Sequence, residues 1–267
     1  MASGNCNIVV LDEGHLLDGG LDWSDVETLG KLAVYPRTDV ADIPGRACGA
    51  EIVLLNKTPL NAGALAKLPR LGLVSVLATG YNIVDTAAAA VRGVTVCNVP
   101  GYATASVAQH VFALILEFCN RADMHAEVVA RGHWASSGEW CAPLCTVTQL
   151  EGKRLGLIGR GSIAQKVAAI GRAFGMECIM ASTSHPLGGP GLAPLDEVVS
   201  TSDVLSLHCK LDARTASMVD TPFLRRMKRG ALLVNTARGG LINEADLAEA
   251  LRCGVIAGAA LDVIAHE

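Results

Sequence analysis

Residues 155–166 read LGLIGRGSIAQK, and this stretch decides the fold of the 267-residue chain. It contains Gly159-x-Gly161-x-x-Ala164, a G-x-G-x-x-G/A pattern that indicates a dinucleotide site when it follows a strand and opens a helix. An apolar run precedes it, and a helix is predicted over Ser162–Phe174. Gly159 would permit the tight turn, Gly161 would let the backbone approach a pyrophosphate, and Ala164 would allow close helix–strand packing. These features favour a diphosphate-binding helix start over an ordinary strand–helix turn.

The adenosine end of the cofactor depends on the second strand of this unit. In NAD-binding proteins an acidic residue about 20 positions after the glycines holds the ribose 2′-hydroxyl. Here the predicted strand Glu177–Ala181 ends in Ser182-Thr183-Ser184-His185, with no carboxylate to repel a 2′-phosphate and no Arg to clamp one. The sequence therefore leaves NAD and NADP both open. The residues expected to line the cofactor here are Gly159, Arg160, Gly161, Ser162, Ile163 and Ser182.

The rest of the chain alternates between short apolar runs and helical segments, which predicts parallel sheets covered by helices on both faces. Strands are expected at Ile8–Leu11, Leu32–Tyr35, Glu51–Leu55, Leu71–Leu77, Val94–Asn98, Arg154–Gly159, Glu177–Ala181, Val204–Cys209, Ala231–Asn235 and Ile256–Leu261. Helices are expected at Asn61–Lys67, Thr86–Arg92, Ser162–Phe174, Leu195–Ser200, Pro222–Lys228 and Asn243–Arg252. Ser106–Ala130 would form one long helix or two, and residues 131–150 would have little regular structure. This is the pattern of an α/β protein with doubly wound parallel sheets.

Composition excludes several functional classes. With 22 basic and 26 acidic side chains, a net charge of −4 gives no footprint for nucleic acid. No apolar run is long enough to cross a bilayer, and the start of the chain lacks the basic region of a secretory signal. The nine cysteines form no CxxC pair and no zinc spacing, so we expect reduced thiols and no metal. The sequence thus indicates a cytoplasmic protein.

Several strings of the sequence occur together in one family. They are NKTPL at 56–60, VLATGYNIVD at 76–85, NVPGYATASVAQHVFALILE at 98–117, LEGKRLGLIGRGSIAQ at 150–165, SDVLSLHCKLDARTASMV at 202–219, MKRGALLVNTARGGLINEADLAEAL at 227–251 and IAGAALDVIAHE at 256–267. In this order they resemble the D-isomer-specific 2-hydroxyacid dehydrogenases, of the glycerate dehydrogenase/hydroxypyruvate reductase type. NTARGG and ALDV…E are the most specific of these strings.

The resemblance implies two domains with the active site between them. Residues 1–98 would form a flavodoxin-like substrate domain, and residues 99–267 a Rossmann dinucleotide-binding domain that includes a dimerisation arm at 102–150. The implied enzyme is an oxidoreductase that transfers a hydride between NAD(P)H and a small 2-keto acid, converting hydroxypyruvate or glyoxylate to D-glycerate or glycolate. The implied assembly is a homodimer. Trp134 and Trp140 of the arm would pack across its interface, or Trp140 would reach the pocket of the partner, or both would pack within the chain.

The resemblance also implies how the substrate is bound. Loops at 56–58 and 78–81 would face it, with backbone N–H groups around Thr79 and Gly80 on its carboxylate and Lys57 beside them. Arg238 matches the catalytic arginine. Its planar fork of donors suits a carboxylate next to a carbonyl, and its charge would stabilise the oxyanion that grows during hydride transfer. Its place after a strand, before a Gly-Gly turn, favours a site residue over a surface ion pair.

Further roles are implied around the nicotinamide. Thr236 and Ala237 would line the cofactor, and Asp262 would accept a hydrogen bond from its carboxamide. Glu267 matches the catalytic glutamate, which would bond a histidine and raise the pKa of that imidazole so that it can donate a proton.

The histidine of that pair is not evident in the sequence. In relatives it lies beyond the glutamate, in a stretch with the last strand and helix of the domain that these 267 residues do not contain. We expect His208 to be a core imidazole, and His266 is too close to Glu267 along the backbone to be its partner. Two interpretations stay open: an incomplete sequence of a full enzyme, or a truncated, catalytically impaired nucleotide-binding relative with a regulatory role.

Overall fold

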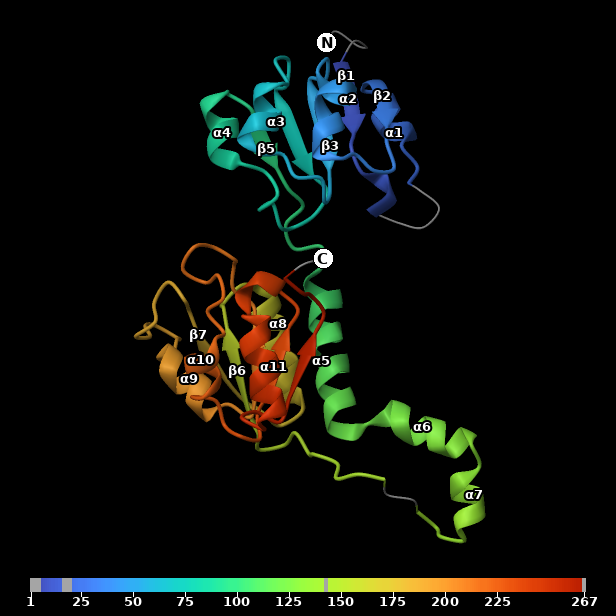
Figure 1. The fold of residues 1–267 in the computed structure, drawn as a ribbon, viewed down its shortest axis with the longest axis vertical. Helices are drawn as coiled ribbons and strands as arrows, with labels where there is room; N and C mark the ends of the chain where they lie inside the picture. Colours follow the sequence, from blue (N-terminus) through green and yellow to red (C-terminus); the bar gives the residue numbers. More distant parts are fainter. Residues whose placement is uncertain (1–5, 16–20, 142–143, 266–267) are drawn as a thin grey trace. The chain divides into compact units, whose positions relative to one another are not determined.

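Two compact units make up the structure, a computed structural model that describes residues 6–15, 21–141 and 144–265 (Figure 1). The first unit is Met1–Tyr102 and the second is Ala103–Glu267. Each unit contains one five-stranded sheet whose paired strands are all parallel. The predicted class, α/β with two doubly wound parallel sheets, is confirmed. The domain boundary expected after residue 98 falls in the connection between the last strand of the first unit and the first helix of the second.

The first sheet has the strand order β2-β1-β3-β4-β5. The direction of strand addition reverses between β1 and β3, so these two strands form the switch point at whose carboxyl edge doubly wound folds bind ligands. The register places Ile8 of β1 between Leu32 of β2 and Ile52 of β3. The strands are β1 (Cys6–Val10), β2 (Gly30–Val34), β3 (Ile52–Leu55), β4 (Leu73–Val76) and β5 (Thr95–Cys97).

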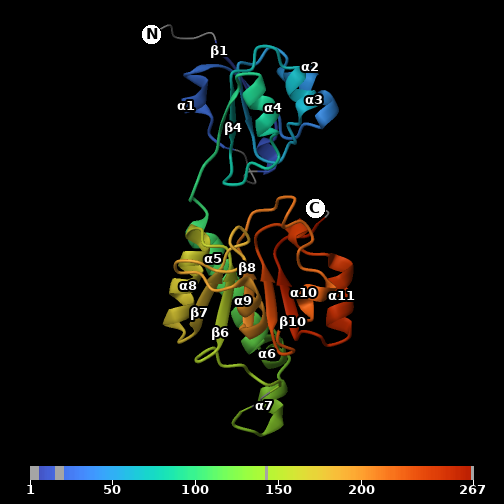
Figure 2. The same ribbon diagram turned by 90° about the vertical axis from the view of Figure 1, so that its left-hand side faces the viewer.

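Side chains alternate between the two faces of this sheet, as strand geometry requires. Val9, Val53 and Val74 are buried on the face covered by α2, α3 and α4, and Ile8 is buried on the other face, where Val26 of α1 packs. Figure 2 shows α1 and the pair α2 and α3 on opposite sides of the first unit. The helices are α1 (Ser24–Glu27), α2 (Ile43–Ala47), α3 (Ala62–Ala66) and α4 (Thr86–Val91), with short 3₁₀ turns at Glu13–His15 (η1) and Val40–Asp42 (η2).

The second sheet has the order β10-β9-β8-β6-β7. Its first two strands in the chain, β6 and β7, are neighbours, and the third, β8, adds on the other side of β6. The connectivity is therefore the same as in the first sheet, and the switch point lies between β6 and β8. The strands are β6 (Arg154–Ile158), β7 (Glu177–Ala181), β8 (Val204–Leu207), β9 (Leu232–Asn235) and β10 (Gly258–Leu261).

Helices cover both faces of the second sheet. On one face Leu157 is buried with Phe112 of α5 and Val167 of α8, and on the other Leu205 is buried with Leu247 of α11. The helices are α5 (Thr104–Asn120), α8 (Ser162–Ala173), α9 (Leu195–Thr201), α10 (Thr221–Leu224) and α11 (Glu244–Arg252), with a 3₁₀ turn at Gly239–Leu241 (η3). Helix α10 is shorter than the predicted Pro222–Lys228.

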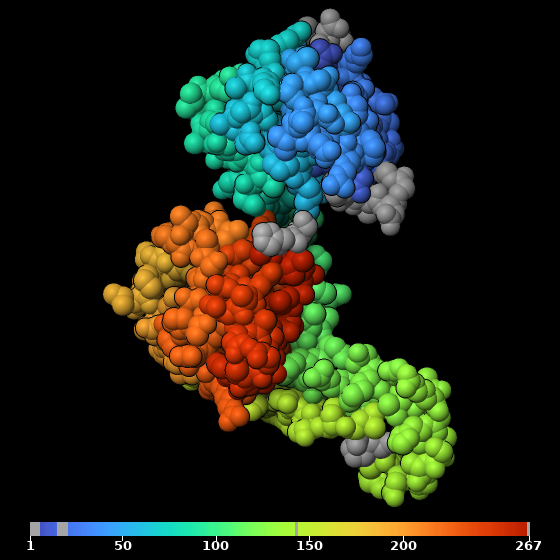
Figure 3. Space-filling view, viewed as in Figure 1, coloured from blue at the N-terminus to red at the C-terminus, as the bar shows by residue number. Residues whose placement is uncertain are grey.

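The segment between α5 and β6 forms an arm. Arg121 adopts a left-handed φ of 49° and divides the predicted 106–130 segment into α5 and α6 (Ala122–Ala130), so two helices form rather than one. Residues 131–150 were expected to have little regular structure, and the short helix α7 (His133–Ser137) lies among them. Neither α6 nor α7 buries any residue. On the face drawn in Figure 3 the surface of this arm is open to solvent.

Two further findings bear on function. None of the helices in the described part of the chain has the length and apolarity that a membrane span requires. All nine cysteines carry free thiols, and no group of three metal-ligating side chains comes together within the described ranges.

Candidate functional site

The fingerprint turn lies at the switch point of the second sheet. Gly159 follows β6 with a φ of 127°, and a Cβ at this position would collide with the carbonyl oxygen of His208, which follows β8. The turn is tied to both neighbouring strands, because Gly159 N–H donates to Ala181 O (2.8 Å) and His208 N–H donates to Ile158 O (2.8 Å). Only glycine fits here, as the sequence predicted.

The space in front of the turn is open. A Cβ at Gly161 would meet no atom within 4 Å, and Gly161 serves as the N-cap of α8 without any side-chain cap. Ser162 begins α8, and its Oγ lies 3.2 Å from Oγ1 of Thr104, the first residue of α5. Two helix starts therefore converge at the turn, and both helix dipoles place partial positive charge there. Such an arrangement suits an anion such as a diphosphate.

The remaining residues of the turn divide between surface and core. Arg160 is exposed and Ile163 is partly buried, whereas Ala164, in the first turn of α8, is fully buried. At the end of β7, Ser182 closes a tight turn in which His185 N–H donates to its carbonyl (3.1 Å) and Ser184 N–H to its Oγ (3.3 Å). The strand end beside the fingerprint thus presents hydroxyls, not a carboxylate.

The end of β9 is shaped by a side chain that the sequence analysis missed. Asn235 is fully buried, accepts from Ala237 N–H (3.0 Å) and donates to Arg238 O (2.9 Å). It thereby fixes the backbone of Thr236, Ala237 and Arg238. Only its place directly before these residues in the NTARGG string could have signalled this role.

Two side chains of this turn are suited to a ligand. The Thr236 hydroxyl oxygen is buried and has no hydrogen-bond partner in the described structure. Because a buried hydroxyl without a partner is costly, an orphan of this kind marks a place for a ligand atom. The Arg238 side chain is exposed, and its Nη1 donates to Ala237 O (2.7 Å).

Asp262 follows β10 at the same sheet edge. Its backbone N–H donates to Asn235 O (3.0 Å), and its Oδ1 lies 3.2 Å from Nε2 of His110 on α5. Both side chains are about half exposed. The sequence alone does not indicate a role for His110, because His110 and Asp262 are far apart in the chain.

The segment after Asp262 is held against the arginine turn. A Cβ at Gly239 would collide with the backbone of Ile264, and Ala265 N–H donates to the Glu244 carboxylate (2.6 Å) at the start of α11. Gly239 and Glu244 thus hold the backbone of Ile264 and Ala265 in place. Glu267 and His266 themselves lie outside the described residues.

His208 is not suited to proton transfer. Its Nε2 lies 2.9 Å from Oγ of Ser206, which is fully buried, and burial lowers the pKa of His208 to about 4. The imidazole is therefore neutral at physiological pH and already hydrogen-bonded. The prediction of a hydrogen-bonded, non-catalytic histidine is confirmed, but the side chain is only partly buried and follows β8 instead of lying within a strand.

The predicted substrate residues lie at the carboxyl edge of the first sheet. Exposed Lys57 follows β3, and Thr79 and Gly80 follow β4. Thr79 is anchored to the segment after β5, because its Oγ1 donates to Val99 O (3.0 Å) and its carbonyl accepts from Asn98 Nδ2 (2.8 Å). Within the described ranges no hydrogen bond uses the N–H of Thr79 or of Gly80.

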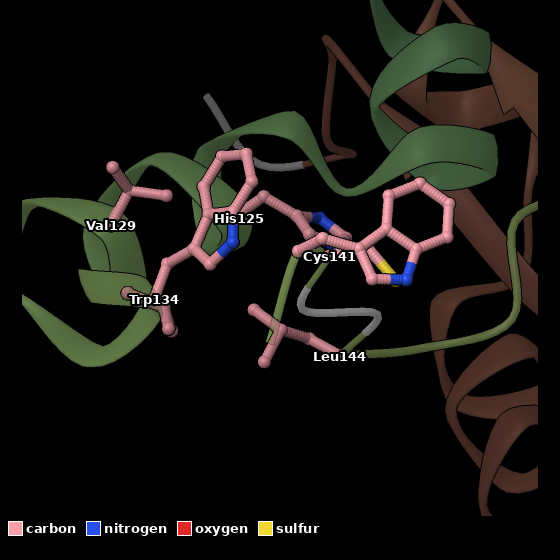
Figure 4. A pocket seen from close by; sticks show the side chains of 7 residues that line it. His125, Val129, Trp134, Cys141 and Leu144 are labelled. Atoms are coloured by element: carbon pink, nitrogen blue, oxygen red, sulfur yellow. The ribbon is translucent and has the colours of Figure 1, made fainter. Parts of the chain in front are cut away.

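The arm contains an apolar hollow of about 360 Å³. Figure 4 shows side chains of α6, α7 and the following segment around it. Its lining includes His125, Val129, Trp134, Trp140 and Leu144.

Comparison with known proteins identifies the family. The model for the D-isomer specific 2-hydroxyacid dehydrogenase NAD binding domain matches residues 112–267. Hydroxypyruvate reductase of Blautia hydrogenotrophica is 41% identical, over 97% of this chain and 83% of that protein. Glycerate dehydrogenase of Methylorubrum extorquens is 40% identical, over 85% of this chain and 71% of that protein. The structure of an acyclic imino acid reductase (Bsp5), in complex with NADPH and D-Arg, superposes with a TM-score of 0.86 at 28% identity, covering 98% of this chain and 84% of that one.

The chain therefore belongs to the D-isomer-specific 2-hydroxyacid dehydrogenase family and is an NAD(P)-dependent oxidoreductase. The two relatives are of the glycerate dehydrogenase/hydroxypyruvate reductase type, so the resemblance found in the sequence is confirmed. The cofactor prediction, NAD or NADP, is also confirmed. The open cradle at Gly161 and the orphan hydroxyl of Thr236 fit such a cofactor.

Proposed function

We propose that this protein reduces hydroxypyruvate or glyoxylate to D-glycerate or glycolate with NADH or NADPH. The observation that carries the proposal is the exposed Arg238 on a turn fixed by buried Asn235, at the same sheet edge as the fingerprint turn. A bound nicotinamide supplies the hydride, which adds to the carbonyl carbon of the keto acid while a proton adds to its oxygen. The two relatives named above support this substrate class.

Each proposed site residue has a distinct task. Gly159 to Ile163 would hold the diphosphate, Ser182 the adenosine ribose, and Thr236 and Ala237 the nicotinamide half. Asp262 would accept from the carboxamide, with His110 fixing the orientation of its carboxylate. Residues 99–267 would thus be the dinucleotide-binding domain and residues 1–98 the substrate domain.

Arg238 would bind the keto acid and stabilise its transition state. A guanidinium presents a planar fork of donors, which matches a carboxylate next to a carbonyl, and its charge stabilises the developing oxyanion. In the first unit, the N–H groups of Thr79 and Gly80 would receive the substrate carboxylate, and Lys57 would add a positive charge. Glu267 would raise the pKa of the proton-donating histidine, which in relatives lies in the stretch beyond Glu267 that these 267 residues do not contain.

The arm supports a homodimer. Helices α6 and α7 bury no residue, while Trp134 and Trp140 are 44% and 87% exposed around the apolar hollow. Exposed apolar surface of this kind marks an interaction site, and a second copy of the arm offers a matching apolar face. The free thiols of all nine cysteines support a cytoplasmic location, where reducing agents keep thiols unpaired.

A steady-state assay tests the proposed reaction. Oxidation of NADH and NADPH is followed with hydroxypyruvate, glyoxylate and pyruvate, and we expect turnover with at least one of the first two. The Arg238→Lys variant keeps the charge but loses the fork, so kcat/KM should fall about 100-fold or more while nucleotide affinity is unchanged. Arg70→Lys, which alters an exposed ion pair with Glu51, is the control and should behave as wild type. A wild-type chain that binds nucleotide but reduces none of the three acids would contradict the proposal.

A further inference from the structure

Asp12 follows β1 and has a carboxylate that is completely buried. The carboxylate accepts three backbone hydrogen bonds from the loop after β3. Oδ1 accepts from Asn56 N–H (2.7 Å), and Oδ2 accepts from Lys57 N–H and Thr58 N–H (2.6 Å each). Three consecutive peptide groups of the loop therefore point at one internal anion.

Consecutive N–H groups that converge in this way form an anion-binding nest. The nest lies at the switch point of the first sheet, between the ends of β1 and β3, where doubly wound folds bind their ligands. In the second unit the corresponding point carries the open cradle at Gly161. In the first unit a carboxylate of the protein itself fills that position, so the switch point is closed to external phosphates.

The hydrogen bonds to Asp12 limit how the 56–58 loop can contribute to substrate binding. Its N–H groups at residues 56–58 are committed to Asp12, whereas those of Thr79 and Gly80 on the neighbouring loop have no partner within the described ranges. The loop after β4 can therefore receive a substrate carboxylate through its backbone. The loop after β3 can contribute only through the side chains of Asn56 and Lys57.

The carboxylate also determines where those side chains stand. The loop runs from Leu55 at the end of β3 to Leu60, which pairs through Leu60 N–H with Ile83 O (2.8 Å). Between these two anchors, the backbone N–H groups of Asn56, Lys57 and Thr58 all donate to Asp12. The Thr58 hydroxyl adds a long bond to Thr38 O (3.5 Å). Hydrogen bonds to an ionised acceptor are roughly twice as strong as neutral ones, so the Asp12 carboxylate is a main anchor of the loop backbone.

We propose that Asp12 is a positioning residue of the substrate site: an internal anion that holds the 56–58 loop and thereby places Lys57 at the carboxyl edge of the first sheet. The proposal rests on the proposed function for the identity of the substrate. The hydrogen-bonded nest itself can be tested without turnover.

The test is chemical rescue of an Asp12→Ala variant. This substitution leaves three donors around a vacancy that a formate ion fits. We expect KM for the keto acid to rise about tenfold or more, with kcat less affected and the Kd of the nucleotide unchanged. Added formate should restore KM toward the wild-type value and raise Tm of the variant, after correction for its effect on the wild-type protein. Formamide, which is similar in size but uncharged, should do neither.

A matched control separates positioning from loss of stability. Asp85→Ala also removes a carboxylate of the first unit that accepts a backbone N–H (Ala88, 2.9 Å), at the start of α4. It should lower Tm without any formate-dependent recovery. If Asp12→Ala does not fold, Asp12→Asn is measured instead; its amide offers one acceptor oxygen and places a donor against the remaining N–H groups, so KM should again rise.

The outcomes are distinguishable. A KM for the variant equal to that of wild type, or an elevated KM and Tm loss that formate does not repair, overturns the positioning role. If the wild-type chain reduces no keto acid, the proposed function fails, but a formate-dependent rise in Tm of Asp12→Ala, absent from Asp85→Ala, still establishes the filled nest.

Discussion

Thr236 illustrates how a single unsatisfied atom points to a ligand. Its hydroxyl oxygen is buried without a hydrogen-bond partner in the described structure, at the end of β9. Replacing it by valine keeps the shape and removes the polar atom. If the hydroxyl serves the cofactor, Thr236→Val should weaken nucleotide binding about tenfold, and Tm should stay level or rise because a buried orphan is removed.

Ser206→Ala is the comparison variant, because the Ser206 hydroxyl, unlike that of Thr236, has a hydrogen-bond partner in His208. This variant should lose on the order of 1 kcal/mol of stability and keep its nucleotide affinity. Fluorescence titration of NADH and NADPH gives both dissociation constants, and thermal unfolding gives Tm. If Thr236→Val binds NADH and NADPH as tightly as wild type, the Thr236 hydroxyl does not contact the cofactor.

His208 makes stability depend on pH in a defined direction. Burial lowers the pKa of its imidazole from 6.5 to about 4, so the unfolded chain binds a proton at a higher pH than the folded one. The contribution of neutral His208 to the free energy of unfolding is therefore fully present above about pH 6.5 and is lost as the pH falls toward 4. The loss should be on the order of 1–3 kcal/mol, given that the ring is partly exposed.

Denaturant unfolding at pH 7.5 and pH 5 measures this dependence. His208→Gln should show a smaller drop in the free energy of unfolding between the two pH values than wild type. His185→Gln, an exposed histidine, should show the wild-type drop. Equal drops in wild type and His208→Gln would contradict the assignment.

At the scale of elements, local signals predicted the five strands of the second unit and the helices that cover its sheet. The strand Glu177–Ala181 matches β7 at both ends, and the glycine pattern predicted where β6 gives way to α8. Helices α1, α2 and α7 were missed, and each has only four or five residues, too few for an apolar period to show. The equally short helices α3 and α10 were predicted. Each of these begins at a capping residue, Asn61 or Asp220, whose side chain accepts a backbone N–H, and α1, α2 and α7 have no such cap.

The candidate site residues could be predicted from the sequence where they stand in short family-specific strings. They could not be predicted where their role depends on contacts between distant segments. Gly159, Thr236 and Arg238 stand in such strings. Asp12, by contrast, acts on residues more than forty positions away, and nothing in its own neighbourhood distinguishes it from a surface aspartate. His110, paired with Asp262, was missed for the same reason.

The two glycines of the fingerprint turn should respond differently to alanine. Gly159 has a φ of 127° and a Cβ there would strike His208 O, so Gly159→Ala should lower stability by several kcal/mol. Gly161 has an ordinary φ of −69° and open space around it, so Gly161→Ala should fold with Tm near that of wild type. Its added methyl group would occupy the cradle, so nucleotide affinity should fall tenfold or more. Thermal unfolding and nucleotide titration of both variants check this contrast, and normal nucleotide affinity in Gly161→Ala would place the diphosphate elsewhere.

At the scale of the whole molecule, the arm is the part of the chain on which the proposed dimer depends. Both sheets bury their apolar faces within their own units, in separate clusters. Helices α6 and α7 bury nothing, and a nine-residue helix is marginal in water without packing. The proposed dimer would supply the packing that α6 and α7 lack within one copy of the chain.

A charge placed in the arm should separate the proposed dimer. Val129 lies on α6, is 50% exposed and lines the apolar hollow, so Val129→Asp would bring an unpaired carboxylate into the proposed interface. Light scattering coupled to size-exclusion chromatography should give about twice the 27.7 kDa chain mass for wild type and a value near the single-chain mass for the variant. Leu187→Asp makes the same change at a 91% exposed leucine outside the arm and should leave the dimer intact. Because α6 and α7 lose their packing in the monomer, Val129→Asp should also show lower helical content by circular dichroism, and a dimer of undiminished mass in this variant would exclude the arm as the interface.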